Sequence, residues 1–325
     1  AGAVNKGVMK LDVNSRISLG NNDSSGGATC TIFGYLAGDK IASGGTDNTL
    51  IGKQSGNQTT YGITTGDYNT AVGSSTLGAS AGSNITGSYN TAVGYQSMLE
   101  AEGSLGSNTA IGADSLRNLT VGSNNVAVGS GAFKSAAVGE SGNVIIGQGA
   151  ADLFDEGTAG GDIDYNVAIG YDAFIGGDLA GNDRQVQGNI AIGAFALDAT
   201  SDNAQTGIIA IGHQSLTSLT SGTDNSAVGY KSLFACNTGV QNTALGTHAL
   251  YGTDDGVSNT AIGAYAMHVG NAGTSNTAVG AQSMIDVTGN YNTAVGMQSL
   301  FDITSGSSNV ALGALAMKDA HAGES

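Results

Sequence analysis

The pentapeptide NTAVG at residues 292–296 decides the fold, because the chain repeats it along most of its length. The same five residues stand at 69–73, 90–94 and 276–280, and close variants include 108–112, 125–129, 189–193, 242–246 and 259–263. Aligned on their final glycine, 15 copies follow one another at intervals of 16 to 23 residues. A repeat of this length is typical of a solenoid, in which each copy forms one coil stacked on its neighbours.

The full unit is N-[TVI]-A-[VIL]-G-x-x-[SA]-[LMF], followed by a polar, glycine-rich spacer. A sixteenth, degenerate copy stands at 30–34, where Cys30 takes the place of the asparagine. We expect residues 1–44 to be an N-terminal cap or connector containing this degenerate repeat, and residues 45–325 to be the repeat solenoid. The longest intervals carry insertions near 152–164 and 176–188. They leave the unit intact, which places them in loops.

The segment Thr-Ala-Val is short and β-prone, and it predicts a strand of three to five residues. Alternation puts Thr293 and Val295 on one face, and Asn292, Ala294 and Gly296 on the other. The face of small residues requires a close neighbour, either the opposite wall of a flat coil or other chains around a three-fold axis. The segment x-x-[SA]-[LMF] supplies a bulky core residue and is compatible with a second strand or one helical turn. The sequence therefore predicts an all-β, parallel β-solenoid (β-roll or β-helix) of about 15 coils.

The asparagine of the unit stands in 14 of the 15 copies, with Ile208 as the exception. Asparagine tolerates turn geometry and bonds to nearby backbone. Stacked at one position of successive coils, its amides can also bond to one another as a ladder. We expect this structural ladder at Asn69, Asn90, Asn108, Asn125, Asn143, Asn166, Asn189, Asn225, Asn242, Asn259, Asn276, Asn292 and Asn309.

The composition excludes some partners. The 325 residues include 54 Gly and no Pro or Trp, and the net charge is −16. This charge disfavours nucleic acid and anionic membranes as partners, and no apolar run is long enough to insert into a membrane. Cys30 and Cys236 would lie too many coils apart for a disulfide within one chain. The final residues 323–325 read like the lead-in to another repeat, so we expect the natural chain to continue.

Several stretches resemble tail-fibre proteins of marine phages, including cyanophages: residues 14–23, residues 31–38 and repeats such as 90–98. More distantly, the unit is similar to the head repeats of trimeric autotransporter adhesins, although this chain has a different period and no coiled-coil stalk. The resemblance implies a homotrimeric virion fibre that contacts other virion tail proteins and a glycan or protein of the host surface. The alternative is a bacterial surface adhesin or an extracellular filament subunit.

The tyrosines Tyr95, Tyr171 and Tyr230 each follow the repeat glycine directly. They are candidates for surface contact with glycans, or they only stack on each other. Histidines His213, His248, His268 and His321 have no metal-site companions in sequence. We expect no cofactor and no metal. The weak metal candidates are the acidic residues Asp162, Asp164, Asp254 and Asp255, which also fit solvated loops.

We expect no catalytic residues. Residues 78–82 match the nucleophile elbow G-x-S-x-G but lie in a spacer. A polysaccharide-cleaving β-helix needs paired carboxylates at a fixed position, whereas the acids here fall mainly in variable spacers. An ice-binding solenoid needs an unbroken threonine file. Threonine holds the second position in eight copies, and Val, Ile or Ser interrupts it in the others.

Overall fold

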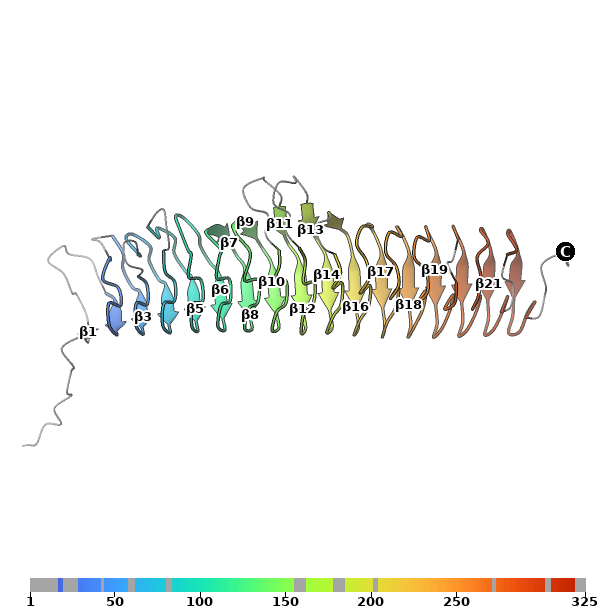
Figure 1. Ribbon diagram of the computed structural model, residues 1–325, viewed down its shortest axis with the longest axis horizontal. Helices are drawn as coiled ribbons and strands as arrows, with labels where there is room; N and C mark the ends of the chain where they lie inside the picture. Colours follow the sequence, from blue (N-terminus) through green and yellow to red (C-terminus); the bar gives the residue numbers. More distant parts are fainter. Residues whose placement is uncertain are drawn as a thin grey trace, which may run out of the picture.

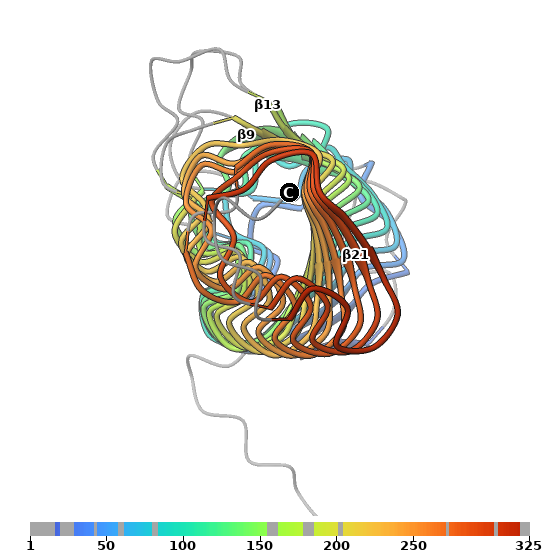
Figure 2. The ribbon, with the colours of Figure 1, turned by 90° about the vertical axis from the view of Figure 1, so that its right-hand side faces the viewer.

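The computed structural model describes residues 17–19, 29–41, 44–57, 62–79, 84–154, 162–177, 185–200, 204–270, 273–301 and 305–318, with only the backbone at 17–19. Throughout these ranges, the regular elements are short β-strands. They stack into a long rod (Figure 1), which forms a closed ring when viewed along its axis (Figure 2). The expected all-β, parallel β-solenoid is thereby confirmed.

One sheet runs the length of the rod, and its 17 strands in the described ranges come from the repeated pentapeptide and one N-terminal segment. The parallel strands are β2 (Thr31–Phe33), β3 (Thr49–Ile51), β4 (Thr70–Val72), β5 (Thr91–Val93), β6 (Thr109–Ile111), β8 (Val126–Val128), β10 (Val144–Ile146), β12 (Val167–Ile169), β14 (Ile190–Ile192), β16 (Ile209–Ile211), β17 (Ser226–Val228), β18 (Thr243–Leu245), β19 (Thr260–Ile262), β20 (Thr277–Val279), β21 (Thr293–Val295) and β22 (Val310–Leu312). β1 (Ile17–Leu19) pairs antiparallel with β2, at the N-terminal edge of this sheet. At the strand spacing of a β-sheet, the parallel strands span roughly 70 Å.

The strands pair in strict register, so equivalent repeat positions form files along the rod. Ala71 pairs with Ala92, and Ala92 pairs with Ala110. The degenerate copy at 30–34 joins the same sheet, because β2 pairs with β3 with Ile32 opposite Leu50. A one-residue slip would turn every buried alanine outward, and the pattern therefore fixes the register.

A second, shorter row of parallel pairs lies on another side of the ring. It comprises β7 (Val121–Ser123) with β9 (Val138–Ser141), and β11 (Asp162–Asp164), β13 (Gln185–Gln187) and β15 (Gln205–Thr206) in one sheet. β9 and β13 lie at the top of the ring, above the strands of the main sheet such as β21 (Figures 1 and 2). This row comes from the spacers, whose length varies, and it is correspondingly less regular. The central parts of both insertions, 155–161 and 178–184, lie outside the described residues.

The segment after each glycine is neither of the two expected forms. It is a run of turns in which the second and fourth residues after the glycine have positive φ, as Gln96 (54°) and Met98 (51°) do after Gly94. These residues bond to different neighbours. The Gln96 N–H donates to the Ser74 carbonyl of the preceding coil at 3.1 Å, and the Met98 N–H donates to the Ser115 carbonyl of the following coil at 3.0 Å. Alternating φ therefore lets one segment bond in both directions along the axis.

The core lies inside each coil and continues along the axis. The strand alanines, such as Ala92 and Ala294, are fully buried, and so are the large residues four positions after the glycine, such as Met98 and Phe133. The face of small residues thus packs against the opposite wall of its own coil. Of the two alternatives for this face, packing between chains around a three-fold axis is wrong.

The glycine of the unit is required by contact with the next coil. Gly112 has φ +138°, and a Cβ built on it would lie 2.3 Å from the carbonyl oxygen of Gly129. Gly147 has φ +141° and would meet the Gly170 oxygen at 2.0 Å. Real Cβ atoms do not approach carbonyl oxygens this closely, so any side chain would push the coils apart at the corner.

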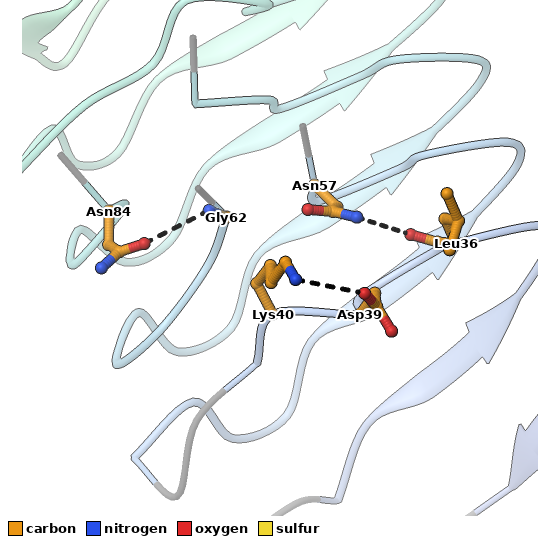
Figure 3. Close-up of polar contacts among 6 residues, drawn as sticks. All are labelled: Leu36, Asp39, Lys40, Asn57, Gly62 and Asn84. Carbon is orange, nitrogen blue, oxygen red and sulfur yellow. Dashed lines mark hydrogen bonds and ion pairs between the residues drawn. The ribbon is translucent and has the colours of Figure 1, made fainter. Parts of the chain in front are cut away.

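The first coils have longer spacers, and asparagines outside the repeat motif connect them. The buried Asn57 donates from Nδ2 to the Leu36 carbonyl at 3.1 Å, and the Gly62 N–H donates to Asn84 Oδ1 at 3.4 Å (Figure 3). Beside them, Lys40 and Asp39 form an exposed ion pair with 3.5 Å between Nζ and Oδ2. The two hydrogen bonds, of Asn57 and of Gly62, join neighbouring coils, whereas the ion pair lies within one spacer.

Candidate functional site

Two features stand out from the uniform coil: a buried ladder of asparagines and an exposed strip of aromatic rings. In the ladder, each asparagine joins two coils. The N–H and Nδ2 of Asn90 both donate to Asn69 Oδ1, at 2.9 and 3.0 Å. Nδ2 of Asn90 also donates to the Leu105 carbonyl of the following coil at 3.2 Å. A side chain that bonds to both neighbouring coils leaves no buried amide group without a partner.

The same hydrogen bonds recur at nearly every expected position. An asparagine N–H donates to the Oδ1 of the preceding asparagine at Asn69, Asn90, Asn108, Asn125, Asn143, Asn166, Asn189, Asn242, Asn259, Asn276, Asn292 and Asn309. These side chains are at most 1% exposed, apart from the half-buried Asn309. Asn48 belongs to the same file, because its Oδ1 accepts from Asn69. The ladder is therefore a buried structural element and offers no surface to a ligand.

The ladder has one interruption, at Ile208. Its backbone N–H still donates to Asn189 Oδ1 at 3.0 Å, but its side chain offers nothing to Asn225. The ladder resumes where Asn242 donates to Asn225 Oδ1 at 3.0 Å. In the degenerate copy, the Cys30 thiol donates to the Gly45 carbonyl at 3.5 Å, which is the bond that the asparagine Nδ2 makes elsewhere.

Both cysteines are buried and free. Burial raises the pKa of the Cys236 thiol to about 11, so this group is a neutral thiol at physiological pH. A buried neutral thiol is a poor nucleophile, and Cys236 accordingly serves the core.

The second feature, the aromatic strip, lies on the turns that follow β12, β14, β16, β17, β18 and β19. It consists of Tyr171, Phe195, His213, Tyr230, Phe234, His248, Tyr251, Tyr265 and His268. One file runs coil by coil through Tyr171, Phe195, His213, Tyr230, His248 and Tyr265, with neighbouring centroids 5.1 to 6.0 Å apart. A shorter file of Phe234, Tyr251 and His268 runs beside it. The coil spacing of the solenoid thus sets the spacing of the rings.

Neighbouring rings in the file are either edge-on or stacked, and the first two pairs, from Tyr171 to His213, are both edge-on. His213 stacks on Tyr230 with an interplanar angle of 20°, whereas Tyr230 meets His248 edge-on at 82°. The tyrosines stay accessible: Tyr171 is 48% exposed, Tyr230 45% and Tyr265 39%. Edge-on and offset stacked pairs are the favoured aromatic geometries, so the rings hold one another in place while parts of their faces remain in solvent.

Charge in the strip is limited. The Lys231 ammonium lies 5.0 Å from the centroid of Phe234 and 5.5 Å from that of Tyr230, within cation–π range. Partial burial, with His268 and Lys231 nearby, lowers the pKa of His248, which is consequently neutral at pH 7. At the other end, Asp172 directly follows Tyr171, and burial together with Asp172 raises the pKa of Asp198.

Of the three tyrosines singled out in the sequence, Tyr171 and Tyr230 belong to one file, with the rings of Phe195 and His213 between them. Tyr95 is 56% exposed but lies several coils away, outside the strip. Phe195, His248 and Tyr265 were missed, because they stand two residues after the glycine and not one. A search for aromatic residues either one or two residues after the glycine in consecutive coils would find them, because these two positions lie side by side in neighbouring coils.

The acidic candidates are dispersed. Asp162 and Asp164 flank the buried Ile163 on β11, where Asp164 Oδ1 accepts from the Ser141 N–H at 2.6 Å and Asp162 Oδ2 accepts from Gln187 Nε2 at 3.4 Å. The Asp254 carbonyl accepts from the Asn237 N–H at 2.9 Å. Within the described ranges, no three His, Cys, Asp or Glu side chains form a group that could hold a metal ion.

Other sequence features fall partly outside the described part of the chain. Residues 80–83, which include the serine of the elbow-like motif, lie outside it, and so do His321, residues 1–16 and 20–28 of the N-terminal segment, and the closing residues 319–325. Among the described residues, no helix has the length and apolar character needed to cross a membrane. No protein-family model matches the chain, and no curated protein is significantly similar to it.

Proposed function

We propose that this chain is a structural fibre of a virion, a phage tail fibre that projects toward the host cell and attaches to its surface. The observation that carries the proposal is the continuous rod, in which successive coils are bonded by strand and turn hydrogen bonds and, except at Ile208 and Cys30, by the asparagine ladder. A rod of this kind holds its ends at a fixed distance. The sequence resemblance to phage tail fibres supports the same role, in contact with other virion tail proteins.

Self-association into a homotrimer is part of this proposal, and the outward face of the main sheet supports it. The third residue of each strand points outward and is apolar, as in Ile51 (37% exposed), Ile111 (41%) and Leu245 (48%). The first residue also points outward and is Thr, Val, Ile or Ser. In other strands the third residue is half-buried, as at Val72 and Ile192. A file of apolar side chains that reach the surface along a whole rod is unusual for a monomer. The chains of the trimer would therefore pack through this face.

The oligomeric state is tested by light scattering combined with small-angle X-ray scattering. A mass near three times 31.9 kDa with an elongated profile is expected. Substituting lysine for Ile111, Leu245 and Ile262 should convert the trimer to monomers, because it places charges in the shared face. A monomeric wild-type chain would overturn the trimer.

The biological role is tested by immunogold labelling with antibodies against the purified chain. Label at the tails of virions is the expected result. Label on the envelope of uninfected cells would instead favour the alternative, a bacterial surface adhesin or extracellular filament. An assay of thermal hysteresis tests the ice-binding alternative, which rests on outward threonine files such as Thr243, Thr260, Thr277 and Thr293.

A further inference from the structure

The aromatic strip is a local addition to the coil, and the fold does not need it. In most coils outside the strip, the residue after the glycine is small or polar, as in Ser74, Ala113 and Ser130. Tyr35 and Tyr95 also follow a repeat glycine, but no aromatic residue stands at this position in the next coil. Those coils stack with the same register and the same hydrogen bonds. The strip also concentrates rare residues, with three of the four His of the whole chain in six successive coils. Rings that the core does not use, placed in one line, point to a contact made at the surface.

The chemistry of the strip narrows the class of ligand. Each accessible ring offers an apolar face, and the tyrosine hydroxyls and histidine nitrogens offer hydrogen-bonding groups at the edges. Nδ1 of His248 and Nδ1 of His268 are buried without a hydrogen-bond partner, so these imidazoles are held by ring packing. A ligand that matches has apolar patches bordered by hydroxyls and repeats along a line. A linear oligosaccharide has this form, because its rings expose C–H groups on one face and hydroxyls at the rim.

The charges of the chain and of the strip argue against polyanions and against cationic ligands. The net charge of −16 disfavours nucleic acids and other polyanions, and Asp172 and Asp198 lie at one end of the strip. The ring faces of Tyr230 and Phe234 that suit a cation are already approached by Lys231. Carboxylates accept hydrogen bonds from neutral hydroxyl donors. An uncharged ligand rich in hydroxyls therefore fits both the rings and the acids beside them.

We propose that the strip from Tyr171 to His268 binds a neutral linear glycan, which lies along the rod axis over Tyr171, Tyr230 and Tyr265. This inference rests on the proposed attachment function and names the class of receptor that it would engage. Sugar rings would stack on the exposed tyrosine faces, and sugar hydroxyls would bond to tyrosine hydroxyls and the Asp172 carboxylate. The glycan would contact several coils at once, so binding should grow with glycan length.

The test uses the full chain in native affinity electrophoresis, with gels that contain a neutral glucan, mannan, galactan or xylan, or an acidic polyuronate. We expect at least one neutral polysaccharide to retard the wild-type protein. In the double variant Tyr230→Ala, Tyr265→Ala, the apparent dissociation constant obtained from the retardation should rise at least tenfold. In Tyr230→Phe it should rise less, because this variant keeps the ring. Because the chain has no Trp, tyrosine fluorescence gives a second readout of binding.

The matched controls are Tyr95→Ala and Tyr291→Ala, which remove tyrosines that are 56% and 63% exposed outside the strip. Both should bind as the wild type does, and circular dichroism melts should show that all variants fold. Equal loss in the controls, retardation by the acidic polymer alone, or no retardation by any neutral polymer would each overturn the proposal. Immunogold label on virion tails together with no glycan binding would leave the fibre role standing and remove only this inference.

Discussion

Asn125 donates from both its backbone N–H and its side-chain Nδ2 to the single Oδ1 of Asn108, at 3.0 and 3.1 Å. The Oδ1 of Asn125 in turn accepts from the N–H and Nδ2 of Asn143, at 3.1 and 3.0 Å. The single residue Asn125 thus donates hydrogen bonds to the preceding coil and accepts them from the following coil, which links three coils. Because the site is fully buried, water cannot replace any of these bonds, and each bond matters more than an exposed one.

Replacing Asn125 with alanine should destabilise the rod strongly. The Asn143 N–H loses its acceptor, and the Glu140 carbonyl loses the donor that now lies 2.7 Å away. Each buried group left unpaired costs about 1–3 kcal/mol, so we expect a loss of about 3 kcal/mol or more. Urea denaturation followed by circular dichroism measures it. Ser130→Ala, at an exposed turn position, is the control and should change stability by less than about 0.5 kcal/mol. A loss at Asn125→Ala no larger than the control would show that the ladder is dispensable.

The interruption at Ile208 gives the converse experiment. The substitution Ile208→Asn removes a buried apolar side chain, worth about 1.5–3 kcal/mol. It restores up to four ladder bonds at about 0.5–1.5 kcal/mol each. We therefore expect unchanged or slightly greater stability in the same denaturation assay. The reverse change, Asn125→Ile, should cost several kcal/mol, and equal losses for both would contradict a hydrogen-bonding role for the file.

Alanine substitutions at two of the repeat glycines can separate the effect of steric contact with the next coil from the effect of backbone strain. Gly112 and Gly313 have similar φ, +138° and +118°, but a Cβ on Gly112 would meet the Gly129 oxygen, whereas one on Gly313 has no neighbour within 4 Å. Both alanine variants bear the cost of an unfavourable φ, about 1–3 kcal/mol. Gly112→Ala must also displace the next coil. We expect its melting temperature to fall clearly further than that of Gly313→Ala, and equal falls would mean that φ alone requires the glycine.

Stability should also depend on pH through Asp152. Burial raises the pKa of this carboxyl, Lys134 lowers it, and Asp172 and Asp114 raise it further. A group with a raised pKa in the folded state stabilises the protein below its unfolded pKa, near 4, and loses that contribution as pH rises through the folded value. Asp152→Asn should consequently be more stable than the wild type at pH 7, and the difference should vanish below about pH 4. Melting curves between pH 3 and 8 check this. A variant less stable than the wild type at pH 7 would contradict the prediction, because it would mean that the ionised Asp152 stabilises the fold.

The strands could be predicted from the sequence because glycine, asparagine and alternation mark each one. At Thr293–Val295 the expected strand is the observed one. The turn segment could not be predicted in the same way. Met98 and Gln96 have positive φ although neither is a residue that favours it, so tertiary hydrogen bonds between coils decide their conformation.

The aromatic strip shows a second limit. Contacts between Phe195 and Tyr171, or between His248 and Tyr230, join residues at different repeat positions. Their proximity depends on how far one coil is displaced over the next, which the sequence does not state. The same holds for the small-residue face of Ala92 and Ala294. The sequence allowed it to pack against its own coil or against other chains, and only the burial of these alanines within each coil distinguishes the two.

The ladder of bonds between coils also determines how the rod would yield under tension. Its intercoil bonds lie along the axis, so a pull on one end loads the outermost coil first and the next only after that coil has peeled away. Each released coil frees about 17 residues, which extend by up to roughly 60 Å. The rod would therefore lengthen in steps, one coil at a time, and each step would dissipate part of the energy of the pull.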